Sequence, residues 1–215
     1  MLAFFIYQGH CYVEYERLEN DSSKIVGEYL GTATGLIDEW TPRDGYVELA
    51  GSVEGDFYSV KGYEPSFLLC MQKEGTVSLY VREGGITLKT GADLYNKWLH
   101  LSEDYREVRY ETRASWYYGS GEVRQLDAPR AQEVLDFIQA LDEAEFLPVE
   151  EVEARSGISP FAESEIYHMY FLTENGMTVH LRLHEGGYVR FQGLLNICVQ
   201  IPEETFRGLT ALFQS

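Results

Sequence analysis

The chain has 215 residues, which is enough for one large domain or two small ones with buried cores. Hydrophobic residues make up 45% and charged residues 24%, a balance that is typical of folded proteins and excludes general disorder. The net charge of -18 excludes a nucleic-acid partner, because phosphate backbones are bound by clustered Lys and Arg, and acidic residues outnumber basic ones both before and after residue 126.

The first residues and the cysteines bear on the cellular compartment. No apolar run approaches the roughly 18 residues that span a bilayer. The opening MLAFFIYQGH is short and lacks a basic leader, so it predicts a strand; a targeting segment of an exported protein would have been removed. Cys11, Cys70 and Cys198 lie far apart without CxxC spacing. This spacing predicts buried free thiols, and one disulfide with an odd thiol is the alternative.

The first 70 residues have the pattern of strands and turns. FFIYQGHCYVEYERL consists of two apolar-rich runs around Gly9, which predicts a hairpin, and residues 45–71 predict short strands separated by glycines. Gly27, Gly31 and Gly35 recur every four residues. A phosphate-binding loop would need a Gly-Lys-Ser/Thr ending, so these glycines predict turns and bulges.

Two later segments resemble each other. Residues 76–91, TVSLYVREGGITLKTG, align without a gap with residues 178–193, TVHLRLHEGGYVRFQG, and seven of the sixteen positions are identical. Each segment follows an apolar run and a turn that ends in glycine, so each predicts a three-stranded meander. We interpret the match as an internal duplication. To keep the apolar residues on one face, the first copy needs the two-residue loop Gly84–Gly85 and the second the three-residue loop 185–187.

A helix is expected after each meander. In residues 127–148 Asp127 can cap the start and Pro148 bounds the end, and in residues 201–213 Pro202 suits the first turn. The apolar sides are expected to hold Ala131, Val134, Leu135, Ile138 and Leu141 in the first helix, and Phe206, Leu209, Leu212 and Phe213 in the second.

The remaining segments predict a hairpin in residues 106–126, around Gly119 and Gly121, and a surface loop in residues 151–164. The whole pattern predicts an α+β protein with predominantly antiparallel sheets and two helices. It would consist of two related sheet-plus-helix units, residues 1–126 and 127–215, which either pack as one body or join near residue 127.

The second meander predicts a candidate binding surface. Asn175–Gly176 indicates a two-residue hairpin loop that pairs Leu172 with Val179 and Tyr170 with Leu181. The opposite face then carries Tyr167, Met169, Phe171, His180, Arg182, His184, Tyr188, Arg190 and Gln192. Like charges placed opposite each other cost energy unless an anion lies beside them. The candidate hypothesis is that Arg182 and Arg190 bind a small anionic ligand, with the rings stacking on it. A solvated or covered face, neutralised by Glu side chains, is the alternative.

Neither a metal site nor a catalytic site is predicted. His180 and His184 are four strand residues apart, roughly 13 Å, and His168 is expected on the other face. No HExxH motif, calcium loop or GxSxG elbow occurs, so we predict no metal, no cofactor and no catalytic residue. The abundant carboxylates, among them Asp38, Glu39, Asp44, Glu54 and Asp56, keep an acid pair of the glycosidase type open.

Aromatic residues are frequent, and ASWYYGSG places three of them beside a flexible turn. If exposed, Trp116, Tyr117 and Tyr118 would stack on sugars or anchor a protein partner. As alternating strand residues, Trp116 and Tyr118 would pack inside while Tyr117 faces water, and this is the arrangement that we expect.

The runs IVGEYLGTATGLIDEW and FYSVKGYEPSFLLCM combine a Gly-Glu-x-Leu-Gly turn with a Tyr-x-Val-Lys-Gly-Tyr strand. This pattern, in residues 25–71, resembles uncharacterised domains attached to bacterial cell-envelope proteins. The resemblance carries no activity or functional residue. It implies an extracytoplasmic sensing or interaction module whose targeting segment is absent from this chain.

The sequence therefore predicts a non-catalytic binding or interaction domain, with a protein or a small anionic ligand as partner. A carbohydrate-active hydrolase using a carboxylate pair is the alternative. An inhibitor-like protein that presents its sheet to an enzyme is a third function that the sequence does not separate from the first.

Overall fold

The computed structural model describes residues 3–18, 22–37, 45, 47–102, 105–157, 164–194 and 196–214. The chain forms two compact units. The first is Met1–Thr87 with Asn175–Met177, and the second is Leu88–Glu174 with Thr178–Ser215. The division that we expected near residue 127 lies within the second unit, because β7 (Tyr105–Thr112) pairs with β10 (Glu165–Thr173) in a single sheet.

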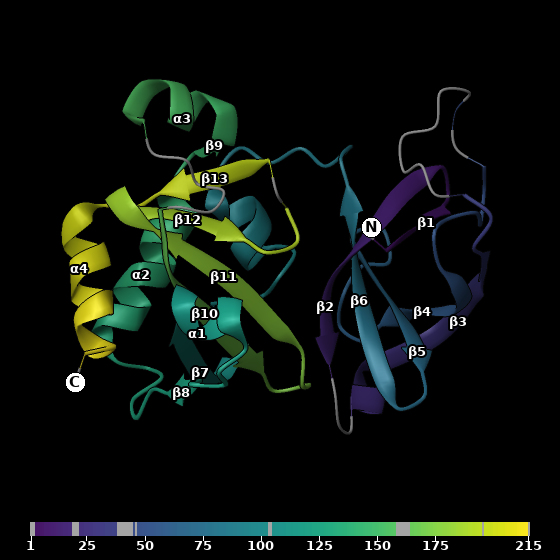
Figure 1. Cartoon of the computed structure of the whole chain (residues 1–215), viewed down its shortest axis with the longest axis horizontal. Helices are drawn as coiled ribbons and strands as arrows, with labels where there is room; N and C mark the ends of the chain where they lie inside the picture. The colour runs from purple at the N-terminus through teal and green to yellow at the C-terminus, as the bar shows by residue number, and fades with distance from the viewer. Residues whose placement is uncertain are drawn as a thin grey trace. The chain divides into compact units, whose positions relative to one another are not determined.

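The first unit is a sheet of antiparallel strands (Figure 1). Over the described residues their spatial order is β1-β2-β6-β5-β4-β3. The strands are β1 (Phe4–Tyr7), β2 (His10–Leu18), β3 (Val26–Thr34), β4 (Glu54–Val60), β5 (Leu68–Lys73) and β6 (Thr76–Glu83), with a 3-10 turn, η1 (Ser22–Ile25). β1 and β2 pair directly across the turn at Gln8 and Gly9, which confirms the predicted hairpin.

The glycines of β3 are bulge and turn positions, as predicted. The register between β3 and β4 shifts on both sides of Tyr29, so Gly27 and Gly31 lie in the irregular part of the strand. Gly35 follows the strand with a φ of 64°, in the left-handed region that glycine adopts without a steric cost. None of these glycines forms a phosphate-binding loop.

Residues 49–52 close the sheet into a barrel. On one side Ile6 donates to Ala50, Leu49 donates to Ile6 and Ser52 donates to Phe4; on the other, Thr34 donates to Leu49 and Ile37 to Gly51. The segment thus bridges β1 and β3, the two edges of the sheet. Gly51 permits this approach, because a Cβ atom there would lie 2.2 Å from the carbonyl oxygen of Phe4.

The barrel interior is filled by one buried cluster with residues from all six strands. Phe5 lies at its centre, with its ring centroid 4.7 Å from that of Phe57, 5.1 Å from Tyr80 and 5.8 Å from Tyr12. The members of the cluster are Phe5, Tyr12, Ala33, Phe57, Leu69, Met71 and Tyr80. These positions alternate with outward-facing residues, as strand geometry requires.

The second unit contains an antiparallel sheet whose strands differ in length. Its order in the described residues is β8-β7-β10-β11-β12-β13-β9. Besides β7 and β10 the strands are β8 (Arg124–Gln125), β9 (Phe146–Pro148), β11 (Thr178–His184), β12 (Tyr188–Phe191) and β13 (Ile197–Gln200). The antiparallel α+β class predicted from the sequence is therefore correct.

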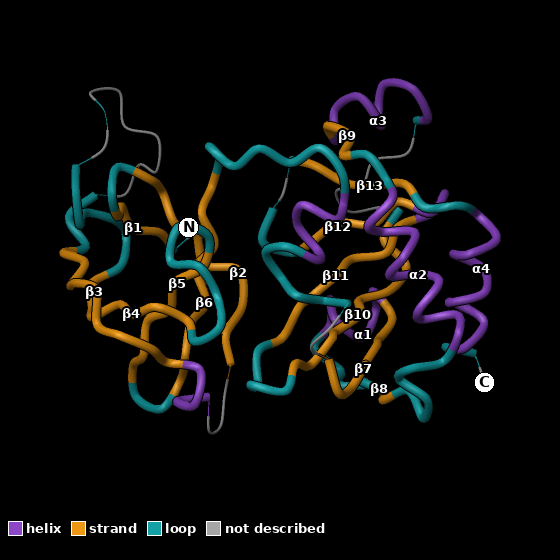
Figure 2. The backbone as a smooth tube through the Cα atoms, turned by 180° about the vertical axis from the view of Figure 1, so that it is seen from behind, coloured by secondary structure: helices purple, strands orange, loops and turns teal. Residues whose placement is uncertain are grey.

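Helices α2 (Gln132–Glu143) and α4 (Glu203–Leu212) run side by side and cover one face of this sheet (Figure 2). The ring of Phe137 lies parallel to that of Phe171, and the ring of Phe213, just after α4, stacks on Tyr110 at 4.3 Å. No helix in the described ranges combines the length and the apolarity needed to cross a membrane.

Both predicted helices form, but one position that we predicted to be buried in the first helix is exposed. α2 begins at Gln132 and not near Asp127, because Ala131 donates to Ala128 in a preceding turn, and its N-cap has no side-chain hydrogen bond. Phe137 takes the buried place that we gave to Leu135, which is 38% exposed. α4 buries Phe206 and Leu209, as predicted.

Further helices occupy segments for which we predicted none. Residues 113–118 form α1 (Arg113–Tyr118) between β7 and β8, so the predicted tight hairpin is wrong, although β7 and β8 do pair. Residues 149–156 form α3 (Val149–Ser156) in part of the predicted surface loop, because Val149 and Val152 bury one side against β13. The other helical segments are a π-helical turn, η2 (Ala92–Asn96), and a 3-10 turn, η3 (Glu185–Gly187).

The internal duplication is not confirmed. The second copy forms the predicted hairpin β11–η3–β12 with the loop 185–187. The first copy forms β6, but residues 86–89 are not a strand, so the predicted loop at Gly84–Gly85 joins no hairpin. The aligned segment also crosses the boundary between the two units at Thr87.

The three cysteines are buried free thiols, as predicted. Burial raises the pKa of Cys11 and of Cys70 to about 12, and that of Cys198 to about 11. All three therefore remain protonated and unreactive at neutral pH.

Candidate functional site

The face predicted to bind a ligand differs from the expectation by one residue of register. β10 pairs Tyr170 with His180 and His168 with Arg182, whereas a two-residue loop at Asn175–Gly176 would have paired Tyr170 with Leu181. The connection instead runs from residue 174 to residue 177. In it the side chain of Asn175 accepts a hydrogen bond from the backbone of Met177 at 3.1 Å, and the buried Met177 belongs to the turn.

Most of the predicted residues nevertheless share a face. Arg182 lies directly opposite Arg190, and His184 opposite Tyr188, as expected, with His180 two residues before Arg182 on the same side. Tyr167 lies on the other face, where its ring contacts Phe213 at 5.0 Å. The shift in β10 places His168 on the arginine-bearing face instead of the opposite one.

These residues form a buried polar network. Glu165 accepts a hydrogen bond from Nε2 of His168 and a second, 3.1 Å long, from Nη1 of Arg182. Nδ1 of His168 and Nε2 of His180 lie 2.7 Å apart. Glu165, His168 and His180 thus form one continuous chain of polar contacts.

The network is covered by Trp116 of α1. The indole stacks on His168 at 4.4 Å, and Cζ of Arg182 lies 4.7 Å from the centre of the same ring. Our prediction that Trp116 and Tyr118 are buried is wrong, because they lie on a helix and not on a strand. Trp116 is 38% exposed, Tyr117 66% and Tyr118 79%.

The charges of this face are compensated within the chain. Burial by itself raises the pKa of Glu165, but the hydrogen bond and charge of His168 and the charge of Arg182 bring this pKa below its usual value. Burial and the charge of Arg182 lower the pKa of Arg190 to about 10. Burial and the charge of Arg190 lower the pKa of His184 to about 3, so this ring is neutral. The Glu165–Arg182 ion pair supports the covered, neutralised alternative.

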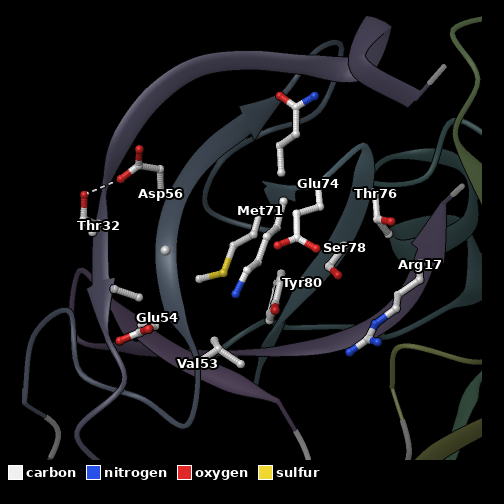
Figure 3. A pocket seen from close by; sticks show the side chains of 14 residues that line it. Arg17, Thr32, Val53, Glu54, Asp56, Met71, Glu74, Thr76, Ser78 and Tyr80 are labelled. Atoms are coloured by element: carbon white, nitrogen blue, oxygen red, sulfur yellow. Dashed lines mark hydrogen bonds between the residues drawn. The ribbon is translucent and has the colours of Figure 1, made fainter. Parts of the chain in front are cut away.

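The more open site is the mouth of the barrel in the first unit (Figure 3). A cavity of about 840 Å³ opens there, within the range of ligand pockets. It is lined by Arg17, Thr32, Ala33, Val53, Glu54, Gly55, Asp56, Met71, Gln72, Lys73, Glu74, Thr76, Ser78 and Tyr80.

Strand alternation shows which lining residues face inward. Ala33, Met71 and Tyr80 belong to the interior cluster, and Val53 packs against it, so they form an apolar floor. On β6 the positions before Tyr80 on the same side are Ser78 and Thr76, which bring hydroxyl groups to the mouth. Glu54 and Asp56 alternate with the buried Phe57 and so lie on the outer side of β4, where Asp56 accepts a hydrogen bond from Thr32 at 2.6 Å.

One of the cations at the mouth is already paired. Arg17 donates to Glu14 through Nε at 2.5 Å and through Nη2 at 3.0 Å. The register places both residues opposite the inward-facing Tyr80 and Ser78. Glu54, Lys73 and Glu74 also line the cavity, and all three residues are exposed to solvent.

Comparison of the chain with protein-family models, curated proteins and solved structures gave no match. The site is therefore characterised by its own geometry. Among the described residues, no group of three or more His, Cys, Asp or Glu side chains is arranged to hold a metal ion. Three of the carboxylates that we considered for an acid pair, Asp38, Glu39 and Asp44, lie outside the described residues.

The residues of the barrel mouth were not among the site residues predicted from the sequence. A signal was present, because Thr76, Ser78 and Tyr80 alternate with the apolar Val77, Leu79 and Val81. We used only the apolar side of this strand to assign a core face. Both sides of β6 carry buried residues, and the more polar side faces the cavity.

Proposed function

We propose that this chain is a non-catalytic binding protein whose first unit holds a small ligand in the mouth of its barrel. The observation that carries the proposal is the 840 Å³ cavity above an interior packed with aromatic side chains. Small barrels hold a single small ligand when side chains fill one part of the interior and leave another part open. An apolar floor with a few polar groups at the rim is the usual composition of such sites.

The proposal keeps the binding role expected from the sequence, but its binding site is the barrel mouth of the first unit and not the face that carries Arg182. The Arg182 face is covered and compensated by Glu165, whereas the barrel mouth holds an open cavity with polar side chains at its rim. The extracytoplasmic sensing role implied by the resemblance fits a ligand-binding module and is part of this proposal. A carboxylate-pair hydrolase is not part of this proposal, because Asp56, one of the two β4 carboxylates that line the cavity, is held by a hydrogen bond from Thr32.

The test is a screen of small metabolites by thermal shift and ligand-observed NMR, repeated on variants that fill the cavity. Ser78→Trp introduces a large ring at an inward-facing position, and Thr76→Trp does so nearer the rim. Both variants are expected to lose binding of the hits by tenfold or more while circular dichroism stays unchanged. If one variant fails to fold, the other provides the test.

The matched control is Ser120→Trp at an exposed position of the second unit, which should bind as the parent does. Hits that bind the folded Ser78→Trp and Thr76→Trp variants with unchanged affinity would refute a site in the barrel mouth. A screen without any hit would also count against the proposal.

A further inference from the structure

Two buried histidines of the second unit are in direct contact. Nδ1 of His168 and Nε2 of His180 lie 2.7 Å apart, and the two residues are 0% and 3% exposed. Whatever the tautomer of each ring, two nitrogens at this distance share one hydrogen, which one of them donates and the other accepts. Because an imidazolium ring carries a hydrogen on both nitrogens, the pair in this geometry accommodates at most one charged ring.

The groups around the pair are already engaged with one another. Glu165 binds His168 and Arg182, and the carboxylate of Glu111 accepts hydrogen bonds from Tyr170 and Ser115. A second imidazolium would therefore bring a further positive charge into a buried region whose carboxylates have their partners, which is strongly unfavourable. The titratable and charged residues that the described strands place on this face are Glu111 and Arg109 of β7, Glu165 and Tyr170 of β10, Arg182 and His184 of β11, and Arg190 of β12.

Helix α1 covers the pair and lies against β7 and β10 (Figure 1). The indole of Trp116 stacks on His168 at 4.4 Å, and Ser115 donates to Glu111 at 2.7 Å. The remaining cation of this helix, Arg113, lies over the ring of the exposed Tyr117. Both rings of the pair are thus confined, because His180 also lies against the ring of Tyr170 at 4.4 Å.

The attachment of α1 is local. The helix has six residues, and residues 119–125, which follow it, are exposed. The opposite face of the sheet is covered by α2 and α4, where Phe137 packs on Phe171 without a contribution from α1. Short segments with few buried contacts open at a lower free energy than the core of a domain, so α1 is able to detach while the sheet remains folded.

We propose that α1 is a lid that opens on acidification, because the closed lid excludes the second proton of the His168–His180 pair. In the open state water reaches both rings, which then titrate near the usual histidine value of about 6.5. Well below this pH opening takes up about one proton or more, so the ratio of open to closed lid rises about tenfold for each pH unit.

The carboxylate of Glu165 does not produce this dependence. Although burial raises the pKa of Glu165, the hydrogen bond and charge of His168 and the charge of Arg182 bring it below its usual value, so the group stays ionised between pH 7.5 and 5. Opening exposes the polar face of the sheet in the second unit and is independent of the proposed ligand site in the barrel of the first unit.

Hydrogen–deuterium exchange of the full chain, followed by NMR, measures the lid. The amides of Gly119, Ser120 and Glu122 report on α1, because they donate to the backbone of Trp116 and to the backbone and Oγ of Ser115. After correction for the intrinsic exchange rate, their protection should fall about tenfold from pH 6 to pH 5. The amides of β10 and β11 should remain at least tenfold better protected than those of α1 throughout.

A substitution within the pair tests its part in the opening. His180→Gln keeps an amide beside His168 but does not titrate, so the fall in α1 protection from pH 6 to pH 5 should shrink to less than threefold. If His180→Gln does not fold, His180→Asn takes its place. The matched control His10→Gln removes a histidine of the first unit and should retain the tenfold fall.

The parent protein gives a second measurement that needs no variant. Long-range ¹H–¹⁵N spectra of the histidine rings show which nitrogens carry a hydrogen, and at most one ring of the pair should be charged while α1 is protected. Two charged rings under a protected α1 would overturn the proposal. So would a protection of α1 that does not change with pH, an undiminished fall in the folded His180→Gln or His180→Asn variant, or loss of protection in α1, β10 and β11 together, which indicates global unfolding and no lid.

Discussion

At the scale of single residues, the strongest local constraint is the buried carboxylate of Glu165. Its side chain is 2% exposed and bonds His168 and Arg182 at once. A buried charge without its partners costs several kcal/mol, so the network is stable only when it is complete. This explains why two arginines lie opposite each other in so acidic a chain: the compensating carboxylate is 17 residues away in sequence but adjacent in space.

We therefore predict that Glu165→Gln lowers the free energy of unfolding by about 3 kcal/mol or more, because Arg182 then lacks a buried anionic partner. Urea denaturation followed by circular dichroism measures the change. The control Glu151→Gln removes an exposed pair with Arg155 and should cost less than about 1 kcal/mol. Equal effects of the two substitutions would contradict the role given to the network.

His184 predicts a dependence of stability on pH. Burial, with the charge of Arg190, lowers the folded-state pKa of His184 to about 3, whereas an unfolded histidine titrates near 6.5. Between these values the unfolded chain binds a proton that the folded chain does not, so stability falls as the pH falls below about 6.5, by up to about 1.4 kcal/mol per pH unit.

His184→Asn removes this titration and retains a side chain for Ser164 to contact. Its unfolding free energy, measured at pH 7, 6 and 5, should fall less steeply than that of the parent. Glu165 adds a further loss at lower pH in both proteins, because its folded pKa is depressed. Parallel curves for parent and variant down to pH 5 would show that His184 is protonated in the folded state.

At the scale of elements, the predictions that proved correct are those that depend on interactions between residues close together in the sequence. The hairpin at Gly9, the loop 185–187 and α4 were predicted correctly, because each depends on a turn or a periodicity within about ten residues. The register of β10 was predicted wrongly by one residue, because Asn175 and Met177 enlarge a turn that the Asn-Gly pair alone indicates as short. That single error exchanged Tyr167 for His168 on the candidate face.

Replacement of two glycines by alanine, one in the segment that closes the barrel and one in α4, is expected to change the stability of the protein in opposite directions. Gly51→Ala would place a Cβ atom 2.2 Å from the carbonyl oxygen of Phe4 and should destabilise the barrel by about 3 kcal/mol or more. Gly208→Ala, within α4, meets no atom closer than 3.8 Å and should stabilise the protein by about 0.5–1 kcal/mol. Thermal and urea unfolding of both variants measures these changes, and a Gly51→Ala protein as stable as the parent would disprove the proposed closure.

At the scale of the whole molecule, each unit has its own sheet and its own buried cluster. Gly51→Ala should therefore raise hydrogen–deuterium exchange in β1–β6 and leave the protection of β10–β12 unchanged. Mass spectrometry of the exchanged peptides measures both regions in one sample. Simultaneous loss of protection in the two units would show that they unfold as one cooperative body.

The sequence by itself determined the features that depend on composition and on neighbours along the chain: a folded acidic protein, antiparallel strands, buried thiols, two amphipathic helices and the opposition of Arg182 to Arg190. Only the tertiary structure decided that β7 joins β10, that Glu165 neutralises Arg182, and that Gly51 closes a barrel whose mouth exposes Lys73 and Glu74. The physical reason is that hydrogen bonds and ion pairs between distant segments produce no periodic pattern in the sequence. Each of them forms only where two segments approach each other closely in the folded chain.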